Sequence, residues 1–208
     1  MTNHILEDTT ASILLIEERK RRDIIIGAPH HTLGGIKNMP CPEHTDGDEN
    51  TGFIARQIAE KLNLSSIIAC NYTIDPNKNL RTDYSIRISK WNPKFLIEIH
   101  GHGAKKVADK VIEISSGSND RNNISTQFAE KLNEKLNKID NLSDHSVNGD
   151  FNTIYFKAKN TATITHDAWT PFHIELPPSI RLDENDKLPS YIDEFINCTI
   201  ETIQEICK

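Results

Sequence analysis

The sequence contains few cysteines, and none of them lies close to another. Its four cysteines are Cys41, Cys70, Cys198 and Cys207, so no Cys-x-x-Cys pair is present. This spacing is not that of a cysteine-based zinc site or of a small disulfide framework. The first residues also lack a basic segment followed by an apolar one, which argues against a secretory signal. We therefore expect free thiols in a reducing compartment and a cytoplasmic protein.

The sequence also lacks an excess of positive charge and a long hydrophobic run. Its 24 Lys and Arg residues face 30 Asp and Glu residues, which gives a formal net charge of −6. A general nucleic-acid binder would carry a basic face, and a membrane-spanning helix would need a much longer apolar run than any present. We expect neither nucleic acid nor a membrane as a partner. Glycine-rich nucleotide-binding motifs and the Gly-x-Ser-x-Gly elbow are absent as well.

Short aliphatic runs alternate with segments of helical periodicity along the chain. The runs predict strands at 12–16, 23–27, 65–70, 95–99, 107–114, 153–156 and 172–176. Apolar residues spaced by about four predict helices at 50–63, 124–138 and 190–206, and a short helix is expected at 83–91, before Asn92-Pro93. The segments 32–49 and 139–152 are expected to be loops. This alternation predicts a single α/β domain over residues 1–208, with three α/β/α layers and a mostly parallel mixed central sheet covered by helices on both faces.

Histidines follow two of the predicted strands. His30 and His31 end the run at 23–27, and His100 and His102 end the run at 95–99. Ligands bind at the carboxyl ends of strands in open α/β sheets, and imidazole is the commonest metal ligand. The two strand ends therefore suggest a metal site. Because strand side chains alternate, only one of His30 and His31 can point toward it, and the sequence does not choose between them.

Carboxylates at three positions could complete this site. Asp48 and Glu49 stand just before the first long helix, where they could cap the helix or supply one metal ligand. Glu175 lies within an apolar strand, where glutamate is rarely buried without a reason. It could pair with Arg181, or it could act as a general base whose pKa is raised by burial. By strand alternation, His173 lies on the same face as Glu175.

The order of these segments resembles the N-formylglutamate amidohydrolase family. That family is similar in fold to zinc carboxypeptidases and to phage poly-γ-glutamate hydrolases. The matching segments are Ala28-Pro29-His30, Asp48-Glu-Asn-Thr51, Asp75-Pro-Asn77-Lys78, Glu98-Ile-His100 and Phe172-His-Ile-Glu175. They run from about residue 24 to residue 181, which is most of the chain.

The resemblance implies a zinc carboxypeptidase-like fold that holds one zinc ion. Carried over by position, it implies that His30, Asp48 and His100 are the zinc ligands, with Asp48 favoured over Glu49 by its spacing to Thr51. It further implies that Glu175 is the catalytic carboxylate.

Other residues are expected to hold the substrate. The resemblance implies that Asn77 and Lys78 hold a substrate carboxylate. The family has arginine where this chain has Lys78, and lysine keeps the charge but loses the bidentate fork. His102 has no counterpart role in the family, and we expect it to face the substrate or to lie behind a ligand.

These expectations describe a zinc-dependent hydrolase that cleaves an amide C–N bond. Metal-activated water would attack an N-acyl amino acid, such as N-formylglutamate, or a peptide-like anionic substrate, with Glu175 as general base. A carboxypeptidase or γ-glutamyl peptidase of the same fold is the second possibility. A non-catalytic module that binds a small acid is the third, and it predicts no metal. The sequence leaves the oligomeric state open.

Overall fold

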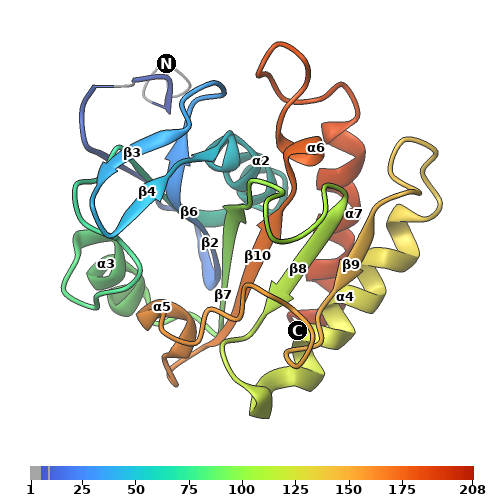
Figure 1. The fold of residues 1–208 in the computed structure, drawn as a ribbon. Helices are drawn as coiled ribbons and strands as arrows, with labels where there is room; N and C mark the ends of the chain where they lie inside the picture. The colour runs from blue at the N-terminus through green and yellow to red at the C-terminus, as the bar shows by residue number, and fades with distance from the viewer. Residues whose placement is uncertain (1–5, 9) are drawn as a thin grey trace.

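A computed structural model describes residues 6–8 and 10–208 of the chain (Figure 1). Residues 1–5 and 9, which the predicted domain includes, lie outside the described residues. The strands are β1 (Ile13–Glu17), β2 (Arg21–Thr32), β3 (Asn38–Cys41), β4 (His44–Asp46), β5 (Asp48–Glu49), β6 (Leu64–Cys70), β7 (Phe95–Gly101), β8 (Val111–Ser115), β9 (Ser146–Asn148) and β10 (Thr170–Leu176). The helices are α2 (Thr51–Leu62), α3 (Asp83–Trp91), the 3-10 helix η1 (Asn119–Arg121), α4 (Asn122–Leu136), α5 (Ala162–Thr165), α6 (Pro178–Arg181) and α7 (Ile192–Ile206).

One eight-stranded sheet organises the described residues. Its order is β1-β6-β2-β7-β10-β8-β9, and β5 pairs with β2 beside this path. The central strands β6, β2, β7 and β10 are parallel, whereas β1 and β8 run antiparallel to their neighbours β6 and β10. The prediction of a mostly parallel mixed sheet is confirmed.

Helices cover both faces of this sheet. Figure 1 shows α4 and α7 on one side of the sheet and α3 on the other. The alternating side chains of the strands divide accordingly. Ile26 and Phe172 pack in the larger core with α2, α4 and α7, while Ile25 and Leu96 pack with Tyr84 of α3. The expected three α/β/α layers are therefore present.

The predicted segment 153–156 is not a strand, and the expectation was wrong. The backbone N–H groups of Tyr155 and Phe156 donate to the carboxylate of Glu113 on β8, at 2.9 to 3.0 Å. The Glu113 carboxylate thus accepts the hydrogen bonds that the backbone of a neighbouring strand would otherwise accept. Two predicted loops also contain short strands: 32–49 holds β3, β4 and β5, and 139–152 holds β9.

The sheet order brings three strand ends together. β7 lies between β2 and β10, and the parallel register of β7 and β10 pairs His100 with Glu175. The three carboxyl ends therefore form one edge, at which side chains far apart in sequence can meet. No helix within residues 6–8 and 10–208 combines the length and the apolar character that crossing a membrane requires.

Candidate metal centre

A β-bulge decides which of the two adjacent histidines enters the site. Regular alternation from Ile25, which faces α3, would place His31 on the α3 side. The register of β2 against β6 shifts between Ala28 and His31, and this irregularity reverses the alternation. The Nδ1 atom of His31 therefore accepts a hydrogen bond from the backbone of Gly52 in α2, at 3.1 Å. His30 is left on the α3 side, at the carboxyl edge of the sheet.

His30, Asp48 and His100 meet at this edge. The Oδ2 atom of Asp48 lies 3.5 Å from Nδ1 of His30 and 3.2 Å from Nδ1 of His100. One donor atom from each of the three residues lies within 4.8 Å of the others. All three side chains are buried. The structure thus brings together the three residues that the sequence resemblance implies as ligands.

The donor atoms of this group fit a divalent metal ion. Nδ1 of His30 and Oδ2 of Asp48 are buried without a hydrogen-bond partner among the described residues. Buried polar atoms are almost always hydrogen-bonded, so unsatisfied ones that point at each other need an explanation. Two imidazole nitrogens and a carboxylate oxygen form a common set of protein ligands in catalytic zinc sites.

Two further carboxylates contact the outer nitrogens of these rings. Oδ1 of Asp75 lies 3.1 Å from Nε2 of His30, and Oε2 of Glu98 lies 3.4 Å from Nε2 of His100. Metal-binding histidines commonly use one nitrogen for the metal and the other for such a partner. Both rings are therefore oriented with Nδ1 toward Asp48.

The electrostatics of the group favour a bound cation. Burial lowers the pKa of His100, but Asp48 and Glu98 outweigh burial and raise that pKa to about 10. For His30, burial is likewise outweighed by Asp48 and Asp75, which leave its pKa above the ordinary value. Burial raises the pKa of Asp48, but both histidines hold it far below the usual range. The buried carboxylates thus create a site that holds positive charge, as protons or as a metal ion.

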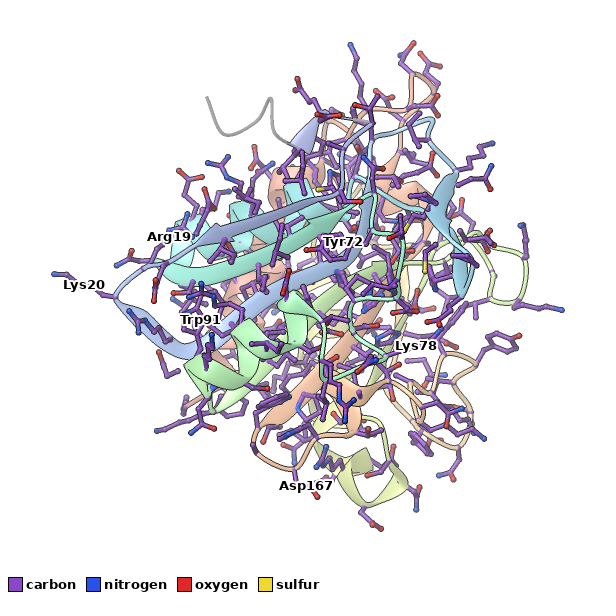
Figure 2. The ribbon with its side chains drawn as sticks, turned by 90° about the vertical axis from the view of Figure 1, so that its left-hand side faces the viewer. Arg19, Lys20, Tyr72, Lys78, Trp91 and Asp167 are labelled. Atoms are coloured by element: carbon purple, nitrogen blue, oxygen red, sulfur yellow. The ribbon has the colours of Figure 1, made fainter. Side chains whose placement is uncertain are left out.

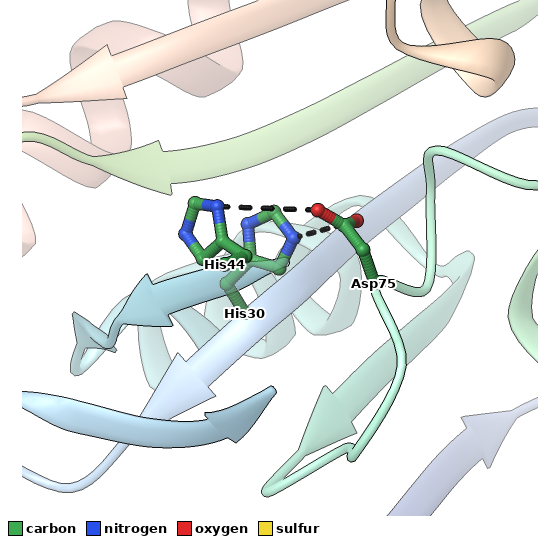
Figure 3. A group of neighbouring side chains, drawn as sticks. All are labelled: His30, His44 and Asp75. Carbon is green, nitrogen blue, oxygen red and sulfur yellow. Dashed lines mark hydrogen bonds and ion pairs between the residues drawn. The ribbon is translucent and has the colours of Figure 1, made fainter. Parts of the chain in front are cut away.

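His44 adds a further ring to the site from the β3–β4 hairpin. Its ring stacks on that of His30, with centroids 3.8 Å apart and an interplanar angle of 15°. Figure 3 shows both rings beside Asp75, whose Oδ2 lies 4.0 Å from Nδ1 of His44. Burial, together with the charge of His30, lowers the pKa of His44 to about 4. His44 therefore covers His30 as a neutral ring.

Glu175 lies beside this group on β10. Its Oε1 accepts a hydrogen bond from Nε2 of His173 at 2.8 Å, and its buried Oε2 has no partner among the described residues. The ring of His173 in turn packs against that of His100, with centroids 4.0 Å apart. His173 and Glu175 share one strand face, as predicted. One carboxylate oxygen is therefore held and the other is free for chemistry.

Two expectations for Glu175 were wrong. Burial does raise its pKa, but the hydrogen bond from His173 and the charges of His173 and His100 together outweigh burial and leave the pKa below the ordinary value. Arg181 is not its partner. The guanidinium donates instead to the backbone carbonyls of Leu176, Glu49 and His102, at 2.8 to 3.1 Å.

The two acids before α2 have different environments. Asp48 faces the histidines, whereas Oε1 of Glu49 accepts a hydrogen bond from the backbone of Gly35 at 2.9 Å. The residue at the N-cap of α2 is Asn50, in a left-handed conformation with φ of 62°. Capping of α2 was one of the two roles considered for Asp48 and Glu49, and neither residue occupies the N-cap position.

The residues expected to hold the substrate lie in three different places. Nδ2 of Asn77 donates to Oε2 of Glu98 at 2.8 Å, so this amide lies behind His100. Nζ of Lys78 lies 2.9 Å from Oδ2 of Asp75. Figure 2 shows Lys78 on the side that carries α3. A ring nitrogen of His102 contacts the carbonyl of Val111 at 2.8 Å.

Solved structures of other proteins share this architecture. No protein-family model matches the sequence, and no curated protein matches it. A bacteriophage poly-γ-glutamate hydrolase aligns with a TM-score of 0.58 at 13% identity, over 98% of this chain and 93% of that one. N-formylglutamate amidohydrolase from Ralstonia eutropha JMP134 aligns with a TM-score of 0.58 at 9% identity, over 93% and 96%. The N-acetylmuramoyl-L-alanine amidase AmiC2 of Nostoc punctiforme aligns with a TM-score of 0.52 at 11% identity, over 89% and 97%.

The chain has the zinc carboxypeptidase-like amidase fold. The resemblance drawn from five short sequence segments is confirmed at the level of fold. At these identities the structural likeness carries no information on substrate, so the chemistry must come from the side chains of this chain.

A cleft opens on the candidate metal centre of this amidase fold. It has a volume of about 590 Å³, and Glu175 and His102 contribute to its lining. Lys37, Lys105 and Lys106 also line it, and all three are exposed. None of these three lysines forms an ion pair within the part of the chain that the structure describes. The exposed part of the wall thus carries three positive charges against one negative charge, that of Asp46. The other charged groups that line the cleft are buried, namely Asp48, Glu49, Glu175 and Arg181.

Several residues of the centre had no role in the sequence-based prediction. Glu98 lies two residues before His100 in an apolar strand, so the period-two argument that linked His173 to Glu175 could have found it. Asp75 stands inside a segment that the resemblance had matched. His44 lay in a segment predicted to be a loop, and nothing in its sequence context indicated a hairpin that folds against His30.

Proposed function

We propose that this protein is a zinc-dependent amide hydrolase whose metal ligands are His30, Asp48 and His100. One observation carries the proposal: Asp48 and Glu175 line the same cleft, and a carboxylate oxygen of each, like Nδ1 of His30, is buried without a partner among the described residues. The amidase fold adds support, because three proteins that share it are named as a hydrolase, an amidohydrolase and an amidase.

The chain's own residues supply the proton transfers of such a hydrolysis. A bound zinc ion would polarise the scissile carbonyl and lower the pKa of water. Oε2 of Glu175 takes a proton from the attacking water and delivers it to the leaving nitrogen. The water oxygen bonds to the carbonyl carbon as the C–N bond breaks, which yields an amine and a carboxylic acid. The lowered pKa of Glu175 keeps it ionised near neutral pH, as a base must be.

The cleft supports an anionic substrate. Lys37, Lys105 and Lys106 place three positive charges on its exposed wall against one negative charge, that of Asp46, in a chain whose formal net charge is −6. Lys78, to which the sequence resemblance assigned this task together with Asn77, already contacts Asp75. We therefore propose that the three cleft lysines hold the substrate's carboxylate groups and that Lys78 acts as a counter-ion of Asp75.

The size of the cleft bears on the choice between an N-acyl amino acid and a peptide. A volume of about 590 Å³ lies within the range of clefts that hold drug-sized ligands. Such a cleft admits a peptide-like amide, so a γ-glutamyl peptidase or carboxypeptidase is the second candidate. Turnover of N-formylglutamate compared with γ-glutamyl peptides distinguishes these two functions.

Glu175→Gln tests the proposed chemistry. The substitution keeps the shape of the side chain but removes the base, so kcat should fall by about 10²- to 10⁴-fold. The zinc content should stay unchanged, as measured on the purified variant. Full activity of the variant would exclude Glu175 as the general base. Binding of small acids without turnover of any amide, in both proteins, would instead indicate a non-catalytic module.

We further propose a cytoplasmic protein that acts on small anionic or peptide-like substrates and binds neither nucleic acid nor membranes. The cysteines Cys41, Cys70, Cys198 and Cys207 are all free and buried, which supports a reducing compartment.

A further inference from the structure

Glu98 is a buried carboxylate that the proposed hydrolysis does not use. Its exposed fraction is 0%, and it lies on the central strand β7 between Ile97 and Ile99. Removing a carboxylate from water is costly unless a strong partner compensates. A glutamate at this position therefore needs a reason, because an apolar residue would suit the middle of a buried strand.

The hydrogen bonds of Glu98 come from an amide, a phenol and one imidazole. Oε1 accepts from the hydroxyl of Tyr84 at 3.1 Å, and Oε2 accepts from Nδ2 of Asn77 at 2.8 Å. The imidazole is that of His100, whose Nε2 lies 3.4 Å from Oε2. No lysine or arginine bonds this carboxylate among the residues that the structure describes. The only partner that can carry a full charge is thus a candidate metal ligand.

The surroundings hold the carboxylate in one place. Tyr84 reaches Glu98 across Gly27 of β2, where a Cβ atom would stand 2.2 Å from the tyrosine oxygen. Only glycine at that position allows the approach. Glu98 is therefore fixed through both of its oxygens, by α3 and by the loop that carries Asn77. A carboxylate held in this way can fix the ring of His100 in turn.

We propose that Glu98 is a positioning residue that holds Nε2 of His100, keeps Nδ1 directed at Asp48, and so strengthens metal binding. The inference rests on the proposed function, because it takes His100 as a metal ligand. In this proposal Glu98 acts through His100 and is not itself a ligand of the ion held by His30, Asp48 and His100. Its negative charge makes the ring a better donor to a cation.

Zinc affinity of the Glu98→Gln variant tests this role. Glutamine keeps the size of the side chain but removes the charge that holds Nε2 of His100. The zinc dissociation constant, measured by competition with a chromophoric chelator, should rise by about 10- to 100-fold. The melting temperature of the metal-free variant shows whether it folds, and the zinc affinity distinguishes the two roles. A purely structural role predicts a lower melting temperature with unchanged zinc affinity.

Glu113→Gln is the matched control. Glu113 is also a buried strand carboxylate, but it accepts backbone hydrogen bonds from Tyr155 and Phe156 and contacts no histidine of the centre. The zinc affinity of the Glu113→Gln variant should equal that of the wild type. If Glu98→Gln does not fold, the Tyr84→Phe variant is used in its place. Tyr84→Phe removes one hydrogen-bond donor to Glu98, so zinc binding should weaken severalfold.

The outcomes separate the two proposals. Zinc binding by a folded Glu98→Gln variant within twofold of wild type overturns the positioning role and leaves the hydrolase intact. Unchanged affinity in Tyr84→Phe has the same meaning if it is the variant used. A wild-type protein that binds no zinc overturns the proposed function, and this inference with it.

Discussion

His173 connects the two halves of the candidate site through its side chain. It donates to Oε1 of Glu175 at 2.8 Å, and its ring packs against that of His100. Burial and the charge of His100 lower the pKa of His173, so the ring is neutral near pH 7 and carries one N–H for this bond. The hydrogen bond from His173 to Oε1 therefore fixes the direction in which the free Oε2 of Glu175 points.

Removing this hydrogen bond should slow the reaction without removing the metal. A hydrogen bond to a charged group contributes about 1.5–3 kcal/mol, which corresponds to a fall in kcat of roughly 10- to 100-fold for His173→Leu. His173→Gln can still donate through its amide and should recover much of the rate. Steady-state kinetics with zinc-loaded variants measures both values. Equal losses in the two variants would show that packing of the ring, and not the hydrogen bond, is what matters.

At the scale of elements, Arg181 joins segments from three parts of the chain. Its guanidinium donates to carbonyls at the end of β10, at the end of β5 and in the loop after β7. A Cβ atom on Gly101 would stand 2.4 Å from the guanidinium carbon, so the end of β7 must be glycine for this arrangement. The segments that bear Glu175, Asp48 and His100 are thus fixed relative to one another.

The loop after β7 should determine binding of anionic substrates. Reversing two charges with Lys105→Glu and Lys106→Glu should raise the KM for an anionic amide severalfold and leave kcat nearly unchanged. The effect should shrink at high salt, because added ions screen exposed charges. Lys90→Glu, an equal change per residue on the exposed face of α3, is the control. An unchanged KM in the double variant would remove these lysines from substrate recognition.

The sequence predicted the elements of this fold better than their local irregularities. Apolar spacing located α2, α4 and α7, and aliphatic runs located β6, β7 and β10, because burial against a sheet imposes those periods. The choice of His30 over His31 depends on a bulge in β2. Pro29 in that segment was a sequence signal of the bulge, because proline inside a central strand is typical of one. The false strand at 153–156 has its N–H groups bonded by a single carboxylate, which depends on tertiary contacts.

At the scale of the whole molecule, the candidate centre concentrates buried charge at one edge of the sheet. Asp48, Asp75, Glu98 and Glu175 are all at least 94% buried there. Their mutual repulsion is reduced by positive charge on His30 and His100 or by a metal ion. Folding and metal binding should therefore be coupled.

A chelator should lower the thermal stability of the zinc-loaded protein. Free zinc at 100 times its dissociation constant stabilises the folded state by about 2.7 kcal/mol. For a chain of about this size, that corresponds to a rise in melting temperature of roughly 5–10 °C. Differential scanning fluorimetry with zinc, and then with excess chelator, measures the shift. Equal melting temperatures in the two conditions would contradict a specific buried zinc site.

Zinc stoichiometry in wild type and His100→Ala tests the central claim most directly. Elemental analysis of the purified protein should give about one zinc per chain, lost in His100→Ala and retained in His166→Ala, whose ring stacks on Trp169 just before β10. Metal-free wild-type protein with full hydrolytic activity would contradict the account, and so would a His100→Ala variant that keeps its zinc.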